Sequence, residues 1–404
     1  MTASITAGSN APRIAGRHFL QIPGPSPVPD RILKAMAMPV IDHRGPEFQA
    51  LGRRVLEGIK TIFKTNDPVI IFPASGTGAW EAALINTMSP GEKVLMYETG
   101  HFATLWKNMA LKLGLEPEFI ESNWRSGAEA GRIAERLSAD PEHAIKAVCV
   151  VHNETSTGAT SRIDEVRKAI DDVDHPALLM VDTISGLASV DYRHDEWGVD
   201  VTVSGSQKGL MLPPGISFNA VSDKAREKAK SAKLPKLFWS WEEMLPHNDK
   251  GFFPYTPATN LLYGLDEAIK MLHEEGLDAV FSRHRRHGEA TRRAVAGWGL
   301  EVLCNVPKYY SPVLTGVVMP EGHNADDFRN VVLANFDMSL GTGLGKVAGK
   351  VFRIGHLGDI NDLTLLGTLA GVEMGFSLAG VPYTKGGAQA AMDYLAETAP
   401  QTRD

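Results

Sequence analysis

The sequence predicts an α/β protein in which a large domain, with a mostly parallel sheet covered by helices, precedes a smaller α+β domain. Short, nearly continuous apolar runs recur at intervals that leave room for a helix, which is typical of strands buried on both faces. After Tyr263 the pattern changes to long helices and then to strand-like pieces around 313–318 and 350–354. The length of 404 residues allows two or three domains at about 100–200 residues each.

The N-terminal part is expected to be an extended arm over residues 1–30. The stretch LQIPGPSPVPD, from Leu20 to Asp30, contains four prolines, which fix φ and exclude helix or central strand. From Pro46, apolar residues recur every three or four positions and predict a helix with one buried face. The preceding DHRGPEF, with His43 and Arg44, is assigned to a turn into this helix.

The apolar runs that predict the sheet begin at Val69 (VIIFP), Lys93 (KVLMY), Ala147 (AVCVV), Ala177 (ALLMV) and Val201 (VTVS). Helical patterns such as GAWEAALINTM and IDEVRKAIDDV lie between them. Cys149 falls within the third run and is assigned to the core. We expect the large domain to span residues 31–275 and the small domain residues 276–404.

Composition excludes several classes of protein. A formal net charge of −7 argues against nucleic acid as a partner, because such proteins usually carry a basic surface. Cys149 and Cys304 are the only cysteines, which rules out a disulfide framework and fits a reducing cytoplasm. The start MTASITAGSNAPR lacks the features of a secretory signal, and no apolar run approaches the roughly 18 residues of a membrane span. We therefore expect a soluble, cytoplasmic enzyme.

A metal site is not predicted. His284 and His287 lie one helical turn apart in SRHRRHGEA and could share a metal ion. The adjacent arginines favour a solvated basic face instead.

Candidate functional residues follow the predicted strands, because ligands of doubly wound sheets bind outside the carboxyl ends of the strands. After VIIFP, Ser75 can cap a helix while Gly76, Thr77 and Gly78 expose N–H groups at its positive end. This arrangement can hold a phosphate or can simply form a tight turn. It is not a dinucleotide fingerprint, since Glu81 replaces the third glycine.

Two further residues favour a cofactor-binding role for this turn. Asp182 follows ALLMV and Lys208 follows VTVS; each alone would be interpreted as an ordinary turn or loop residue. A phosphate-binding turn, a buried carboxylate and a desolvated lysine on one rim fit pyridoxal phosphate. Arg353, inside the apolar pattern GKVFRIGHLG, could bind the carboxylate of an amino-acid substrate or form a structural salt bridge.

At these residues the sequence resembles the class V aminotransferases. The similar motifs are DEWGVDVTVSGSQKGLMLPPG, FPASGTGAWEAAL, VHNETSTG, FPYTPATNLLYGL, KVAGKVFRIGHLGDINDLTLLGTLAGVEM and the PGPSPVP arm, which together extend from about residue 19 to 374. Within the family they are most similar to the groups that use serine or alanine with glyoxylate. The resemblance implies fold type I of the pyridoxal-phosphate-dependent transferases and a homodimer with shared active sites.

The resemblance also implies roles for individual residues, position by position. Lys208 matches the lysine that binds the cofactor covalently, Gln207 a contact on the phosphate side, and Asp182 the partner of the pyridine nitrogen. The remaining matches are Ile184 behind the ring, Phe102 stacked on it, Thr155 near the ring oxygen, Ser75, Gly76 and Thr77 in the phosphate loop, and Tyr255 and Thr256 reaching the phosphate from the neighbouring subunit. Arg353 matches the arginine for the substrate carboxylate, and Gly24 lies in the arm that helps close the site.

The reaction implied is transamination between an amino acid, with L-serine expected first, and glyoxylate, which yields hydroxypyruvate and glycine. Alanine or aspartate as the donor, or a lyase on the same scaffold, remain open alternatives. A nicotinamide dehydrogenase is disfavoured by the missing third glycine and by the lack of a fitting ribose-binding acid. A non-catalytic scaffold is disfavoured because Lys208, Asp182 and Arg353 would then coincide without a purpose.

Overall fold

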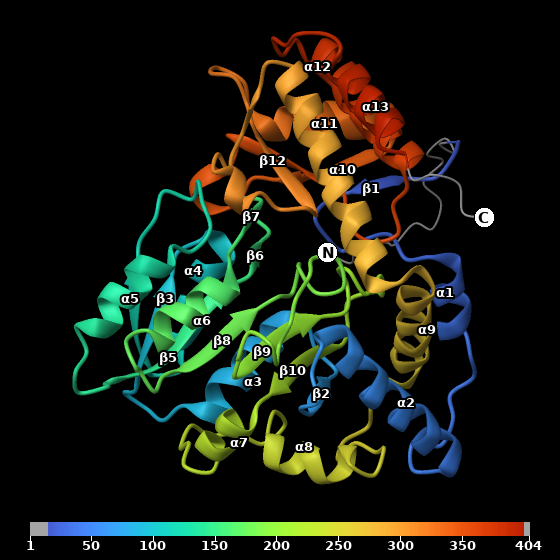
Figure 1. Cartoon of the computed structure of the whole chain (residues 1–404). Helices are drawn as coiled ribbons and strands as arrows, with labels where there is room; N and C mark the ends of the chain where they lie inside the picture. The colour runs from blue at the N-terminus through green and yellow to red at the C-terminus, as the bar shows by residue number, and fades with distance from the viewer. Residues whose placement is uncertain (1–14, 400–404) are drawn as a thin grey trace, which may run out of the picture.

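A seven-stranded sheet forms the centre of the larger part of the chain (Figure 1). The computed structural model describes residues 15–399. The strand order is β2-β10-β9-β8-β5-β3-β4, and β10 is antiparallel to both of its neighbours whereas the other pairs are parallel. The strands are β2 (Val69–Phe72), β3 (Lys93–Tyr97), β4 (Glu116–Ile120), β5 (Ile145–Val151), β8 (Leu178–Asp182), β9 (Val201–Gly205) and β10 (Ser217–Val221). The predicted mostly parallel sheet is confirmed.

Helices cover both faces of this sheet, and successive residues of each strand face opposite layers. Val148 and Val150 belong to the core layer that also contains residues of α2 (Pro46–Phe63), α5 (Ala130–Ser138), α6 (Ile163–Asp171) and α9 (Thr259–Glu275). Ala147 and Cys149 pack with α3 (Gly76–Thr87), α4 (His101–Lys112), α7 (Asp223–Ala229) and α8 (Trp241–Asn248). Cys149 is buried, as expected for a core residue.

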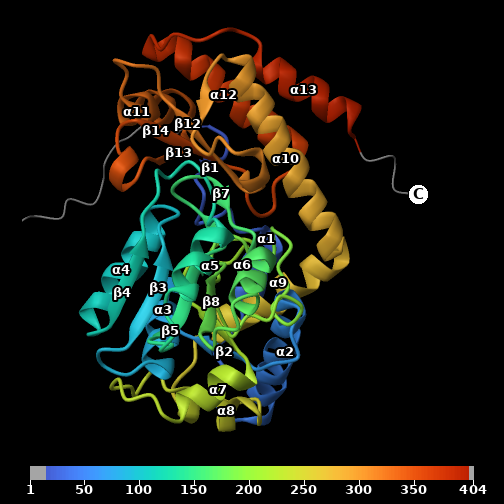
Figure 2. The same cartoon turned by 60° about the vertical axis from the view of Figure 1, so that its left-hand side comes forward.

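A second, five-stranded sheet has the order β1-β13-β14-β12-β11 and lies above the first in Figures 1 and 2. Its strands are β1 (Phe19–Gln21), β11 (Glu301–Val302), β12 (Leu314–Val318), β13 (Met338–Thr342) and β14 (Val351–Gly355). The helices beside it are α10 (Leu277–Gly297), α11 (Ala325–Phe336), α12 (Asp362–Ala379) and α13 (Gly387–Glu397). Short elements complete the chain: a hairpin of β6 (Asn153–Glu154) and β7 (Ala159–Thr160), and 3-10 helices η1 (Pro307–Tyr309) and η2 (Gly345–Val347).

The N-terminal arm contributes a strand to the second sheet. β1 pairs in parallel with β13, and the chain then runs through the prolines without regular structure to α1 (Asp30–Met36). The division into 1–30, 31–275 and 276–404 stays a prediction, and residues 1–14 and 400–404 lie outside the described part.

The expected solvated face around His284 and His287 is wrong. Both rings are buried, with 1% and 0% exposure. His284 Nδ1 donates to the Val280 carbonyl and Nε2 accepts from the Gly358 N–H, while His287 Nε2 lies 3.0 Å from Asp362 Oδ1. The histidines are on the side of α10 that packs against the smaller sheet and its helices, so tertiary contacts decide their surroundings.

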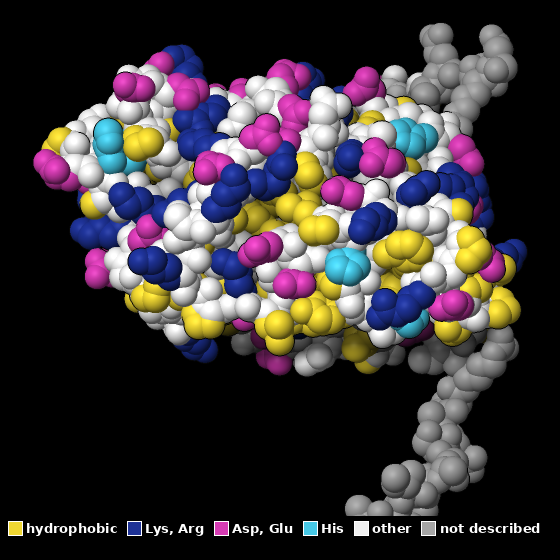
Figure 3. Space-filling model, turned by 90° about the horizontal axis from the view of Figure 1, so that it is seen from below, with side chains coloured by type: hydrophobic (Ala, Val, Ile, Leu, Met, Phe, Trp, Pro, Cys, Tyr) yellow, Lys and Arg dark blue, Asp and Glu magenta, His cyan; other side chains and the backbone are white. Residues whose placement is uncertain are grey.

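The turn assigned to His43 and Arg44 is present before α2, where the Arg44 N–H donates to Asp42 Oδ1. Within residues 15–399, every helix is too short or too polar to cross a membrane. The face drawn in Figure 3 mixes positive, negative and hydrophobic side chains.

Candidate active site

Most of the predicted site residues line one cavity of about 100 Å³ at the carboxyl ends of β5, β8 and β9. α3 begins at this edge, so its N-terminus faces the same space. The lining comprises Ser75, Gly76, Thr77, Trp80, Phe102, Val151, Asn153, Thr155, Asp182, Ile184, Ser185, Gln207 and Lys208. The strand ends thus bring together residues more than 100 positions apart in the sequence.

Lys208 lies just after β9, and its side chain is withdrawn from water. The residue is 8% exposed, and its Nζ donates a 2.6 Å hydrogen bond to the Pro23 carbonyl of the arm. Burial, assisted by the positive charge of Arg353, lowers the pKa of Lys208 to about 7. The amine can therefore be neutral, and nucleophilic, near physiological pH.

The arm leaves room for this lysine only because residue 24 is a glycine. Gly24 has φ +102°, and a Cβ there would stand 2.3 Å from Lys208 Nζ. The arm therefore contacts Lys208 directly, which supports the predicted role of the arm in closing the site. A side chain at position 24 would displace the lysine.

The low pKa of Lys208 predicts how this amine would react with the aldehyde of the expected cofactor. Only the neutral amine attacks a carbonyl, so the rate at which cofactor-free protein binds pyridoxal phosphate covalently should rise with pH, with a midpoint near 7. The rate can be followed by absorbance after mixing, with Nα-acetyl-lysine as the reference amine. A midpoint near that of the free amine, about 10, would contradict this assignment.

Asp182 ends β8 with a buried carboxylate that forms no ion pair within residues 15–399. The residue is 3% exposed, and the Trp80 indole N–H donates to Oδ2 at 2.9 Å while the Ile184 N–H donates to Oδ1 at 2.7 Å. Burial raises the pKa of Asp182 to about 7. A cation such as a protonated ring nitrogen would stabilise the ionised carboxylate here.

Near the start of α3, Ser75 and Gln207 lack hydrogen-bond partners for side-chain polar groups within the described part of the chain. Ser75 is the N-cap of α3, yet its side chain makes no capping hydrogen bond. Gln207 Oε1 is buried and unpaired, and rotation of the amide about its last bond would present its NH₂ group instead. Gly76 is required for close packing, since a Cβ there would lie 2.3 Å from Ile184 Cδ1. These donors and the positive end of α3 fit a phosphate.

The residues present therefore fit pyridoxal phosphate. Among the described residues, a buried amine, a buried carboxylate without an ion pair and a helix N-terminus without a side-chain cap match the aldehyde, the ring nitrogen and the phosphate of this cofactor. The individual roles predicted for Phe102, Thr155 and Ile184 stay predictions, although all three line the cavity.

Arg353 lies in the middle of β14, and its guanidinium reaches the backbone of Thr155, a residue that lines the cavity. It is 7% exposed; its Nε donates to the Thr342 carbonyl and its Nη1 to the Thr155 carbonyl, both at 2.7 Å. Within residues 15–399 it forms no ion pair with Asp or Glu and no hydrogen bond through Nη2. The structural salt bridge considered as an alternative is thus absent there, and a buried guanidinium keeps donor capacity for an acidic ligand.

Sequence reasoning missed two residues of the cavity that hold others in place. Trp80, one helical turn beyond Gly76, orients Asp182 through its indole N–H. Asn153 donates to Ser185 Oγ at 2.8 Å and accepts from the hydroxyls of Thr160 and Ser311, each at 2.7 Å. Position within the VHNETSTG and GAWEAAL motifs was the only available signal, because the hydrogen-bond partners are distant in sequence.

Tyr255 and Thr256 do not line this cavity. They border a separate pocket with Phe238 and Phe253, and the Tyr255 ring stacks on Phe238 at 5.2 Å between centroids. Their expected contact with the cofactor of a neighbouring subunit stays a prediction.

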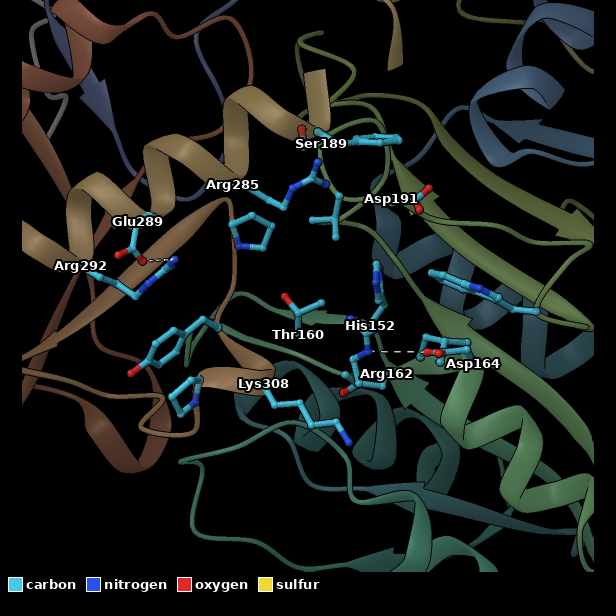
Figure 4. A pocket seen from close by; sticks show the side chains of 18 residues that line it. His152, Thr160, Arg162, Asp164, Ser189, Asp191, Arg285, Glu289, Arg292 and Lys308 are labelled. Atoms are coloured by element: carbon cyan, nitrogen blue, oxygen red, sulfur yellow. Dashed lines mark hydrogen bonds and ion pairs between the residues drawn. The ribbon is translucent and has the colours of Figure 1, made fainter. Parts of the chain in front are cut away.

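A larger cavity, of about 580 Å³, is shown in Figure 4. Arg285, Glu289 and Arg292 line it from α10, opposite His152 and Arg162. It contains neither Lys208 nor Asp182, so cavity size alone would point away from the chemistry. We place the active site in the smaller cavity because the perturbed amine and carboxylate lie there.

Comparisons with known proteins agree with this chemistry. A family model described as aminotransferase class-V matches residues 19–343. The serine–glyoxylate aminotransferase of Methylorubrum extorquens is 47% identical over 394 residues, covering 96% of this chain and 98% of that protein. The L-aspartate–glyoxylate aminotransferase of Paracoccus denitrificans is 44% identical over 379 residues, covering 93% and 96%.

A solved structure supports the fold over the same extent. The ureidoglycine–glyoxylate aminotransferase from Bacillus subtilis has a TM-score of 0.88 and 26% identity, covering 95% of this chain and 100% of that one. The family match, the full-length relatives and the geometry of the cavity lead to one conclusion. The chain belongs to the class V aminotransferases, which use pyridoxal phosphate as their cofactor.

Proposed function

We propose that this aminotransferase moves the amino group of L-serine to glyoxylate, forming hydroxypyruvate and glycine. The observation that carries the proposal is the near-full-length similarity, at 47% identity, to a serine–glyoxylate aminotransferase. A second candidate donor is L-aspartate, because an L-aspartate–glyoxylate aminotransferase is 44% identical.

The residues of the cavity have separate tasks in this reaction. Bound pyridoxal phosphate acts as the electron sink for the bond broken at the substrate Cα. The Lys208 Nζ, neutral above a pH of about 7, accepts the proton from that carbon. Asp182, ionised by the opposing cation, would provide a negative charge at the ring nitrogen, and the N–H groups at the start of α3 would hold the phosphate.

Arg353 orients the amino acid. Its Nε and Nη1 are held by the carbonyls of Thr342 and Thr155, so the guanidinium cannot swing away, and Nη2 is available for the substrate carboxylate. A fixed carboxylate limits the rotation of the substrate and keeps the Cα–H bond directed at Lys208.

A panel of amino donors against glyoxylate tests the proposed substrate. We expect kcat/KM for L-serine to exceed that for L-alanine and L-aspartate by about tenfold or more, since a site built for a hydroxyl loses hydrogen bonds with other side chains. Glycine and hydroxypyruvate should appear in equal amounts. A preference for aspartate would reassign the donor, and serine consumption without glyoxylate would indicate a lyase.

We also propose a homodimer in which Tyr255 and Thr256 complete the partner's active site. The segment next to them carries exposed apolar side chains, Leu237 at 74% and Phe238 at 37%, as a surface covered by another subunit would. The unpaired, buried Cys149 and Cys304 support the further proposal of a cytoplasmic location.

Mixed dimers test the shared site. Lys208→Ala and Thr256→Ala variants should each be impaired as homodimers. After mixing and reassembly, each heterodimer should regain one intact site, in which Lys208 of one subunit meets Thr256 of the other. Activity that never exceeds the sum of the separate variants would contradict sharing, and mixing two samples of the Lys208→Ala variant is the control.

A further inference from the structure

Three potential metal ligands meet at the edge of the large sheet opposite the active site. Asp67 precedes β2, while His194 and Asp195 precede β9. β2 and β9 are both antiparallel to β10 and therefore start at the same edge. One imidazole nitrogen and one oxygen from each carboxylate lie within 4.8 Å of one another.

The histidine has an unused nitrogen directed into this group. His194 is 0% exposed, and its Nε2 is buried and has no hydrogen-bond partner among residues 15–399. Its Nδ1 lies 2.7 Å from Thr202 Oγ1, so the ring orientation is set by the other nitrogen, as is usual for metal-binding histidines. Nε2 lies 3.9 Å from Asp67 Oδ2. A buried, unpaired ring nitrogen is costly unless a ligand satisfies it.

The loops that carry the ligands are held together before any ion binds. The His194 N–H donates to the Phe63 carbonyl at 3.1 Å. Asp195 accepts from Thr65 Oγ1 at 2.5 Å and from the Asn66 N–H at 2.9 Å. Asp195 Oδ2 also accepts from the Asn66 side-chain amide at 3.4 Å, whereas Oδ1, with Thr65 as its donor, keeps a second lone pair. Asp195 is exposed, so an ion can enter from solvent.

The local charge favours a cation. Two of the three ligands are carboxylates. Arg226 lies 4.0 Å from Asp67 and is also paired with Asp223. One guanidinium shared in this way neutralises only part of the negative charge of the two ligand carboxylates.

We propose that Asp67, His194 and Asp195 bind a divalent transition-metal ion, with Zn²⁺ the expected one. Zn²⁺ binds imidazole nitrogen and carboxylate oxygen at about 2.0–2.2 Å, so one ion can bridge atoms up to about 4 Å apart. Asp67 Oδ2 and His194 Nε2 meet this condition, and one Asp195 carboxylate oxygen lies within 4.8 Å of the other two ligand atoms. The ion ties the segment between α2 and β2 to the loop before β9, away from the catalytic residues.

Zinc titration of the holoenzyme by isothermal calorimetry tests the site. We expect one saturable site per chain, and an increase in Tm on adding Zn²⁺, since an ion that binds the folded state stabilises it. Asp67→Asn and His194→Asn should each weaken Zn²⁺ binding by at least about tenfold, the lower range for loss of a partner around a metal. In the His194→Asn variant the introduced amide can still bond Thr202, but it offers no nitrogen at the position of the imidazole Nε2.

Asp223→Asn is the matched control, because it removes a neighbouring negative charge that is not a ligand. It should change Zn²⁺ affinity much less than Asp67→Asn does. Equal weakening by both variants, unchanged binding in Asp67→Asn and His194→Asn, or equal binding of Mg²⁺ and Zn²⁺ would overturn the proposal. Tm values without metal establish that the variants are folded.

Discussion

Replacing Lys208 with alanine is expected to lower kcat by more than about 10³-fold, within the range that a positioned general acid–base contributes. The variant loses both the amine that forms the covalent bond and the base that accepts the Cα proton. Lys208 is the lysine in the cavity, and burial holds its pKa near 7. Steady-state rates with L-serine and glyoxylate measure the effect.

Borohydride reduction followed by peptide mass analysis provides a second measurement. The wild-type protein should retain the cofactor mass on the peptide that contains Lys208, and the variant should not. Lys230→Ala, at an exposed lysine paired with Glu227, is the control and should keep full activity. Comparable turnover in the Lys208→Ala variant would show that another group performs the chemistry.

Asp182→Asn is expected to lower kcat by about 10²–10³-fold. Removing one member of a buried ion pair costs about 3–5 kcal/mol, which corresponds to at least a hundredfold in rate at about 1.36 kcal/mol per factor of ten. The asparagine preserves the size of the side chain but has one acceptor oxygen, so it can accept from Trp80 or from Ile184 and not from both. The variant therefore loses the negative charge that would oppose the ring nitrogen together with one of these two hydrogen bonds.

Rates of the Asp182→Asn variant should be compared with those of Asp140→Asn. Asp140 is also buried and accepts from backbone N–H groups of Ala144 and Ile145, but it does not line the cavity. Asp140→Asn should alter Tm with little effect on kcat once the protein is folded. If both variants lose activity equally, the effect of Asp182→Asn is structural and the assigned role is wrong.

The sequence predicted the parallel strands well because their signal is local. The runs starting at Val69, Lys93, Ala147, Ala177 and Val201 became β2, β3, β5, β8 and β9. β4 and β10 lacked such a signal: β4 has charged residues, and β10 contains Asn219. Asn219 is buried because its amide donates to the Ala79 carbonyl and accepts from the Trp241 indole, which are partners that only folding supplies.

The histidines of α10 show the same limit. Neighbouring arginines suggested solvent exposure, yet helical periodicity places His284 and His287 on the packed side, where Gly358 and Asp362 provide hydrogen bonds. Similarly, the joining of β1 to β13 depends on a pairing between residues more than 300 positions apart. A local sequence pattern cannot identify partners that are so distant in the chain.

Short segments of sequence were sufficient for the fold class, the residues at the strand ends and the cofactor they fit, because hydrophobic periodicity and motif spacing are local properties. How those residues act depends on the folded chain. Burial against the arm brings the pKa of Lys208 to about 7, and Trp80 orients Asp182. The same applies to the unpaired nitrogen of His194 beside Asp67. Desolvation and hydrogen-bond pairing require distant parts of the chain, so they exist only after folding.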